Sequence, residues 1–170
     1  RVAQLLTNPD LVDEKDPDHR SCIHYWAESS AVDREIFTLL IAAKPDIIHD
    51  IVETTGWNAV FTVINNCRGD GYVKIQKLEL LAQFRANFTI ADSKDGKLPV
   101  HYAVMKGEEP VIEYLHKIVP ETFCTRDKFD CTPRDYAPPH SAAESLLDYY
   151  QVPGEEVYAL DYAPIAEYKG

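Results

Sequence analysis

The feature that most constrains this fold is a Gly-x-x-Pro-Val-His-x-Ala motif that begins at Gly96. Gly107 follows it, and then comes an amphipathic run that ends at Tyr114 and Leu115. Proline favours the first turn of a helix, and glycine favours a tight turn after one. We therefore predict a short helix, a tight turn and a second helix between Asp95 and His116.

The motif recurs in weaker form elsewhere in the chain. The place of His101 is taken by His24 upstream, by Phe61 in the middle and by Asp135 downstream. The intervals between these positions are slightly longer than about 33 residues, and insertions in such arrays map to loops. Two insertions stand out, one near Ile47 and one near Arg68. We therefore predict that the chain forms a series of similar helix pairs with added loop residues.

This pattern resembles the ankyrin repeat, whose signature is Thr-Pro-Leu-His-x-Ala. Around His101, the residues Pro99, Val100 and Ala103 fit, while Leu98 stands in the Thr place. The resemblance is to degenerate repeats with loop insertions. It implies an all-α fold, an ankyrin-like helix-turn-helix solenoid of about four irregular repeats followed by a non-repeat C-terminal tail.

The motif positions divide the chain. We expect an ankyrin-repeat domain over residues 1–151 and an acidic, tyrosine-rich tail over 152–170 that packs back on the array. The expected units of the domain are a half-repeat at 1–15 and repeats at about 16–52, 53–92, 93–126 and 127–151. Several helix limits are predicted as well. Asp33 and Ser141 have the character of N-caps, a helix is expected from Val73 to Phe84, and Pro138-Pro139 should stop the last repeat's first helix.

Composition limits the partners. The net charge is −11, from 17 basic and 28 acidic residues. Nucleic acids and anionic membranes are bound by clustered lysine and arginine, so both are disfavoured. No apolar run approaches the roughly 18 residues of a membrane span. The four cysteines lack a Cys-x-x-Cys spacing and are expected to be thiols in a reducing compartment, the cytoplasm or the nucleus.

The chain shows no pattern typical of an enzyme. It has no Gly-x-Ser-x-Gly, no phosphate-binding glycine loop and no His-x-x-x-His metal spacing. We therefore predict no catalytic residues, no cofactor and no metal. By the resemblance, His24 and His101 are structural residues that tie a repeat to its neighbour's loop.

The resemblance also places partner-binding residues. In ankyrin arrays, positions shortly after the opening Asp and before the mid-repeat turn face the concave groove. The matching positions here that we predict to bind a partner are Arg20, Glu28, Thr55, Trp57, Asn65, Lys94, Lys97, Met105, Lys106, Lys128 and Phe129.

Two features follow from this mapping. Trp57, Met105 and Phe129 would form an apolar line along the groove, unless Trp57 packs into the core. The lysines in the C-terminal half would make that part of the groove basic, unless they form an ordinary solvated face. A groove with both features suits a peptide that carries apolar side chains and carboxylates.

The chain's own tail has that composition. Four acidic residues alternate with Tyr158, Leu160, Tyr162 and Ile165. Two alternatives are open for its docking within the molecule. The tail either covers the outer face of the last repeat, as terminal repeats require, or occupies the groove.

The resemblance implies a protein–protein interaction module, an adaptor, scaffold or inhibitor that binds a protein or peptide through its fingers and concave groove. The alternative is a regulatory ankyrin segment of a larger enzyme or channel whose active part lies outside these residues.

Overall fold

The computed structural model describes residues 8–150, and in this range the chain is all-α. Its described elements are 3-10 helices η1 (Pro9–Val12), η2 (Pro45–His49), η3 (Pro120–Cys124) and η4 (Pro133–Tyr136), and α-helices α2 (Cys22–Glu28), α3 (Arg34–Ala43), α4 (Ala59–Asn66), α5 (Gly71–Gln83), α6 (Pro99–Lys106), α7 (Glu109–Ile118) and α8 (Ala142–Tyr149). Within residues 8–150, β pairing is limited to an isolated bridge between Val52 and Trp57.

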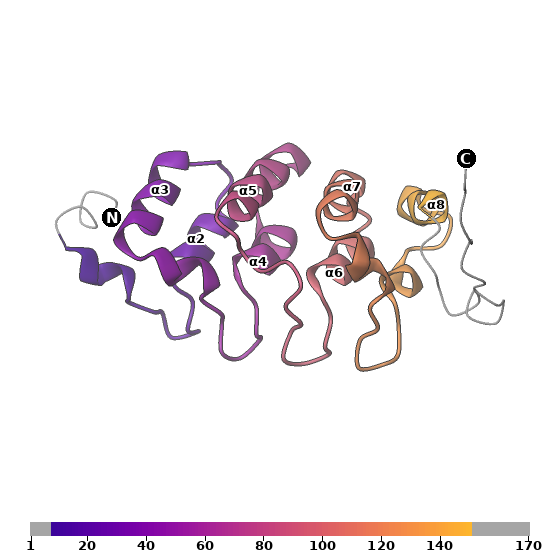
Figure 1. The fold of residues 1–170 in the computed structure, drawn as a ribbon, viewed down its shortest axis with the longest axis horizontal. Helices are drawn as coiled ribbons and strands as arrows, with labels where there is room; N and C mark the ends of the chain where they lie inside the picture. Colours follow the sequence, from indigo (N-terminus) through magenta and orange to yellow (C-terminus); the bar gives the residue numbers. More distant parts are fainter. Residues whose placement is uncertain (1–7, 151–170) are drawn as a thin grey trace, which may run out of the picture.

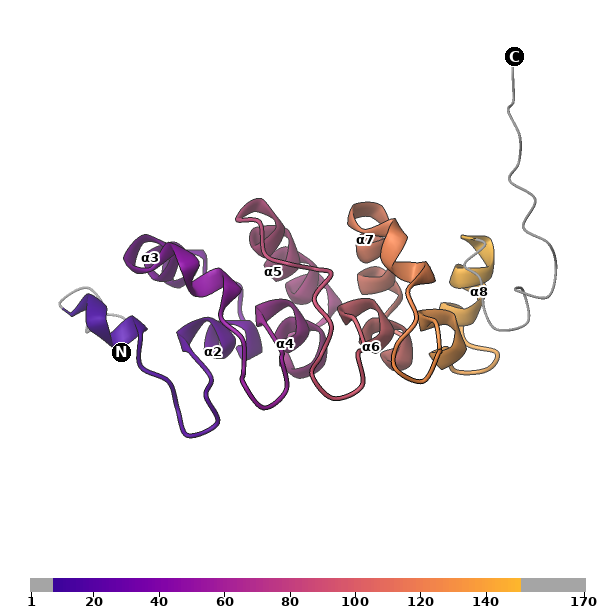
Figure 2. The same cartoon turned by 60° about the horizontal axis from the view of Figure 1, so that its bottom comes forward.

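The helices form a row of pairs, α2 with α3, α4 with α5, α6 with α7, and η4 with α8 (Figure 1). The first members pack side by side, α2 on α4, α4 on α6 and α6 on η4. Among the second members, α5 packs on α7 and α7 on α8. Long loops precede α2, α4, α6 and η4 and project from the same edge of the row (Figure 2). We call residues 13–20, 50–57, 90–97 and 125–131 the hairpin loops.

Side-chain caps fix where several helices begin. Asp33 accepts a hydrogen bond of 2.9 Å from the backbone N–H of Ile36, and Ser141 accepts one of 3.1 Å from Glu144. Both predicted N-caps are thereby confirmed. The helix expected from Val73 to Phe84 is α5, which begins at Gly71 because Asp70 is its cap.

The predicted turns are also present. Gly107 ends α6 with a φ of 67°, a left-handed conformation that glycine adopts without steric strain. The first helix of the last pair is reduced to the 3-10 turn η4, as Pro138-Pro139 predicts. The insertion near Ile47 forms η2, whose Ile47 and Ile48 are buried, so this insertion packs into the core.

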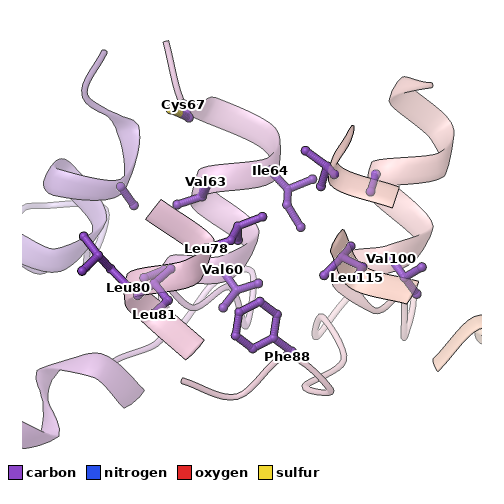
Figure 3. Packing of buried hydrophobic residues seen from close by; sticks show 14 of the residues in the cluster. Val60, Val63, Ile64, Cys67, Leu78, Leu80, Leu81, Phe88, Val100 and Leu115 are labelled. Atoms are coloured by element: carbon purple, nitrogen blue, oxygen red, sulfur yellow. The ribbon is translucent and has the colours of Figure 1, made fainter. Parts of the chain in front are cut away.

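The core is a continuous ribbon between the pairs (Figure 3). Val60, Val63 and Ile64 of α4 lie with Leu78 and Leu81 of α5, and all five are fully buried. Phe88, Val100 and Leu115 extend the cluster toward the next pair, and Figure 3 shows them beyond α4. Each pair therefore buries apolar side chains both between its own two helices and against the neighbouring pair.

Candidate protein-binding surface

The hairpin loops share one construction. A backbone hydrogen bond closes each loop, from Asp16 to Arg20, from Val52 to Trp57, from Asp92 to Lys97 and from Asp127 to Cys131, at 2.8 to 3.1 Å. In the first loop and the last two, the opening aspartate also accepts backbone N–H bonds from inside the loop. The carboxylate thus holds the loop backbone in one shape.

A tyrosine locks three of these loops onto the helix that follows. Tyr25 donates to Asp16 at 2.6 Å, Tyr102 to Asp92 at 2.6 Å, and Tyr136 to Asp127 at 2.5 Å. The hydrogen bond from Tyr25 is the largest cause that lowers the pKa of Asp16, to about 2. Burial, helped by the bond to Asp127, raises the pKa of Tyr136 to about 12.

These tyrosines were not among the predicted site residues. The sequence nevertheless carries a signal for them, since Tyr25, Tyr102 and Tyr136 each directly follow the His position of their motif. The second loop departs from the rule because Val52 replaces its aspartate and Thr62 its tyrosine.

Neighbouring loops are tied to each other. Ser93 donates its N–H to the carbonyl of Thr55, and Lys128 donates its N–H to the carbonyl of Asp95, both at 2.9 Å. Gly56, at a φ of 71°, sits so close to this junction that a Cβ there would lie 2.9 Å from the nitrogen of Ser93. Backbone hydrogen bonds therefore connect the last three hairpin loops into one surface.

The two motif histidines are structural in this fold. Nδ1 of His24 accepts from the N–H of Ser21, and its Nε2 lies 3.1 Å from the carbonyl oxygen of Trp57 in the next loop. His101 repeats the arrangement with Leu98 and Cys131. Burial lowers the pKa of both rings, so they are neutral at pH 7. The expected tie to the neighbouring loop is confirmed.

At the N-terminal end, the predicted contacts Arg20 and Glu28 pair with each other at 3.4 Å. Arg20 also bonds Asp16 at 2.9 Å, and Glu28 accepts from Arg68 of the next repeat at 2.8 Å. Arg68 belongs to the second insertion, which thereby links two repeats. The side chain of Arg68 remains 74% exposed.

In the middle of the row, Trp57 is half-buried. Its ring stacks at 5.8 Å on Phe61 and meets Tyr102 edge-on at 5.6 Å. The hydroxyl of Thr55 accepts from the N–H of Trp57, and the carbonyl of Asn65 accepts from Lys106 at 2.9 Å. Trp57 therefore contributes an aromatic face rather than a protruding ring.

The structure differs from the expectation at Lys97, which is buried rather than facing an open groove. Its Nζ lies 3.1 Å from Asp95 and 3.5 Å from Asp127. It also lies 4.8 Å from the centre of the Phe129 ring and 4.9 Å from that of Tyr136. Lys97 thus holds the last two loops together and supports Phe129 from behind.

The remaining predicted residues are exposed. Phe129 is 62% and Met105 43% exposed. Lys94, Lys106 and Lys128 also lie at the surface. Lys128 reaches over the neighbouring loop tip and donates to the carbonyl oxygens of Ser93 and Lys94, both at 2.9 Å. Phe129, Lys94 and Lys128 therefore form one contiguous area, which we call the loop-tip patch.

A pocket of about 500 Å³ lies at the opposite end of the row, between η1, α2 and α3. Its lining includes the apolar side chains of Leu11, Trp26 and Ile36 and the charged side chain of Arg20. Within the predicted half-repeat at 1–15, residues 9–12 form η1. Residues 1–7 of that unit and the predicted tail at 152–170 lie outside the described residues.

No protein-family model matches this chain, and no curated protein is significantly similar to it. Within residues 8–150, no group of three or more His, Cys, Asp or Glu side chains is arranged to hold a metal ion. In the same range, every helix is too short or too polar to cross a membrane.

Proposed function

We propose that this chain is an ankyrin-like solenoid and that it works as a protein-binding module, an adaptor, scaffold or inhibitor. The observation that carries the proposal is the loop-tip patch, where an exposed aromatic ring stands on a rigid loop beside two exposed lysines. The repeated aspartate–tyrosine and histidine–carbonyl bonds support the repeat assignment, since they recur at matching positions.

Rigid loops suit this function for an energetic reason. Ordering flexible side chains and loops on binding costs free energy. A loop that is already ordered before the partner binds avoids that cost. Aromatic anchors surrounded by polar groups dominate the binding energy of protein interfaces. Phe129, supported by Lys97 and held by Asp127, has these properties. Exposed Met105 adds an adaptable apolar contact.

The test is affinity capture with a Phe129→Ser, Met105→Ser double variant and the wild-type chain. Tyr72→Ser is the matched control, because Tyr72 is 71% exposed and lies on α5, away from the loops. Circular dichroism must first show that all three chains fold. We expect proteins that the wild type and the control retain and the double variant loses. The same retained set for all three chains would refute the proposal.

A further inference from the structure

The two exposed lysines of the loop-tip patch form no ion pair with the described residues of this strongly acidic chain. Within residues 8–150, no carboxylate lies within 4.0 Å of the ammonium groups of Lys94, Lys106 or Lys128. Lys128 uses its ammonium for two carbonyl bonds, and an ammonium has three N–H donors. One donor of Lys128 is thus left for a carboxylate that approaches Phe129.

Helix α8, the second helix of the last pair, exposes little apolar surface apart from Tyr149. The exposed residues of α8 are Ala142, Ser145, Asp148 and Tyr149, of which only the tyrosine is large and apolar. Tyr150 already stacks on His116 at 3.7 Å and covers the end of α7. A segment that follows α8 therefore gains little by capping this face.

The segment that follows α8 complements the loop-tip patch in charge and character. Residues 152–170 contain four carboxylates, Glu155, Glu156, Asp161 and Glu167, and one lysine. Between them stand three tyrosines, Leu160 and Ile165. An extended chain of this length spans roughly 60 Å, at about 3.3 Å per residue, so it can reach the patch.

We propose that the segment 152–170 binds in cis to the loop-tip patch, with its carboxylates on Lys94 and Lys128 and an apolar side chain on Phe129. This inference rests on the proposed function, because the segment then occupies the surface that a partner would use. A partner that displaces it carries the same chemistry, an acidic peptide with spaced aromatic or aliphatic residues. The tail thereby acts as a built-in competitor.

Attachment to the same chain makes this contact effective even when its intrinsic affinity is weak. A short flexible link gives an effective concentration on the order of 1 mM, so a Kd of about 0.1 mM leaves the tail bound about 90% of the time. Because the contact depends on exposed charges, it should weaken as salt rises.

The test is NMR on the ¹⁵N-labelled full chain. We expect tail amide resonances displaced from those of a synthetic 151–170 peptide, and cross-peaks between the Phe129 ring and the methyl groups of Leu160 or Ile165. Lys94→Glu with Lys128→Glu should return the tail resonances to the free-peptide positions, because the tail is then released. Adding Glu155→Lys and Glu156→Lys to that variant should restore the displacement.

The matched control is Arg34→Glu with Lys117→Glu, two exposed cations on α3 and α7, which should leave the tail resonances unmoved. Tail resonances at free-peptide positions in the wild type would overturn the proposal. So would a displacement that survives the Lys94 and Lys128 reversal, or one abolished by Tyr149→Ser instead. No partner is present in this experiment, so its failure is distinct from a failure of the capture experiment.

Discussion

Lys77 donates a hydrogen bond of 2.6 Å from Nζ to the carbonyl oxygen of Ser29 in the preceding repeat. The same ammonium also donates to the carbonyls of Trp26 and Ala27 at the end of α2. The carbonyl of Trp26 also accepts from the backbone N–H and the hydroxyl of Ser29, and α2 ends without a glycine cap. Lys77 thus adds a charged donor to carbonyl groups at a helix end. Burial lowers the pKa of Lys77, but its oxygen acceptors stabilise the charged form.

Replacing this lysine should therefore destabilise the junction between the first two repeats. Lys77→Met keeps an unbranched apolar side chain of nearly the same length but removes the buried donor at the end of α2. We expect a loss of about 2 kcal/mol in the free energy of unfolding, since hydrogen bonds to charged groups contribute about 1.5–3 kcal/mol. Urea denaturation measures it. The exposed Lys117→Met should change stability by less than about 0.5 kcal/mol, and an equally small effect at Lys77 would contradict the capping role.

A second prediction concerns the hydrogen bonds from tyrosine to aspartate in the hairpin loops. Tyr102→Phe removes the donor to the buried carboxylate of Asp92 without changing the ring. The free energy of unfolding should fall by about 1–3 kcal/mol at pH 7, the range for leaving a buried group unsatisfied. Tyr72→Phe, at an exposed site, is the control. If both substitutions were equally silent, the lock would have no energetic role.

We predict that the two buried histidines make the stability of the fold sensitive to acid. Burial lowers the pKa of His24 and His101 below the ordinary 6.5, so the unfolded chain takes up protons first as the pH falls. Their contribution to stability is complete above about pH 6.5 and is lost as the pH falls through the folded-state pKa. Between pH 6.5 and the folded-state pKa, each histidine should lower the free energy of unfolding by up to about 1.4 kcal/mol for every unit that the pH falls.

Urea titrations at several pH values between 7.5 and 5 measure this slope. A His24→Gln, His101→Gln variant retains an acceptor and a donor on each side chain but has no proton to gain. Its stability should change less steeply with pH over that window. A slope equal to that of the wild type would show that other groups cause the acid sensitivity.

Two glycines provide a matched pair. Gly56 and Gly107 both have positive φ, at 71° and 67°, so alanine is strained at either position. At Gly56 a Cβ would also lie 2.9 Å from the nitrogen of Ser93, whereas at Gly107 it would meet nothing within 4 Å. Gly107→Ala should lower stability by about 1–2 kcal/mol and Gly56→Ala by clearly more. The reverse order would contradict the loop junction described above.

The sequence predicts the elements of this fold well where local signals are strong. Asp33, Ser141 and Gly107 mark helix ends through their own backbone chemistry, and a motif of eight residues is enough to place α6. These signals act within a few residues, so no knowledge of distant contacts is needed.

The surface is less predictable because it depends on contacts between repeats. Lys97 has the right position for a groove residue, yet Asp127 of the next loop draws it into a buried pair. Lys77 looks like an exposed helix residue, yet it reaches carbonyls about fifty positions away in the chain. Trp57 is held by Tyr102 from the following repeat. Asp127, the carbonyls of α2 and Tyr102 each belong to a different helix pair from the residue that they contact, so a motif within one pair does not reveal these contacts.

The central claim is that the loop-tip patch and Met105 bind a partner protein. Isothermal titration of a purified captured partner tests it most directly, with the wild type, Tyr72→Ser and the Phe129→Ser, Met105→Ser variant. We predict that the control binds with the wild-type Kd and that the double variant binds at least about tenfold more weakly, the loss expected when an anchor residue is removed. An unchanged Kd for the folded double variant would contradict the claim.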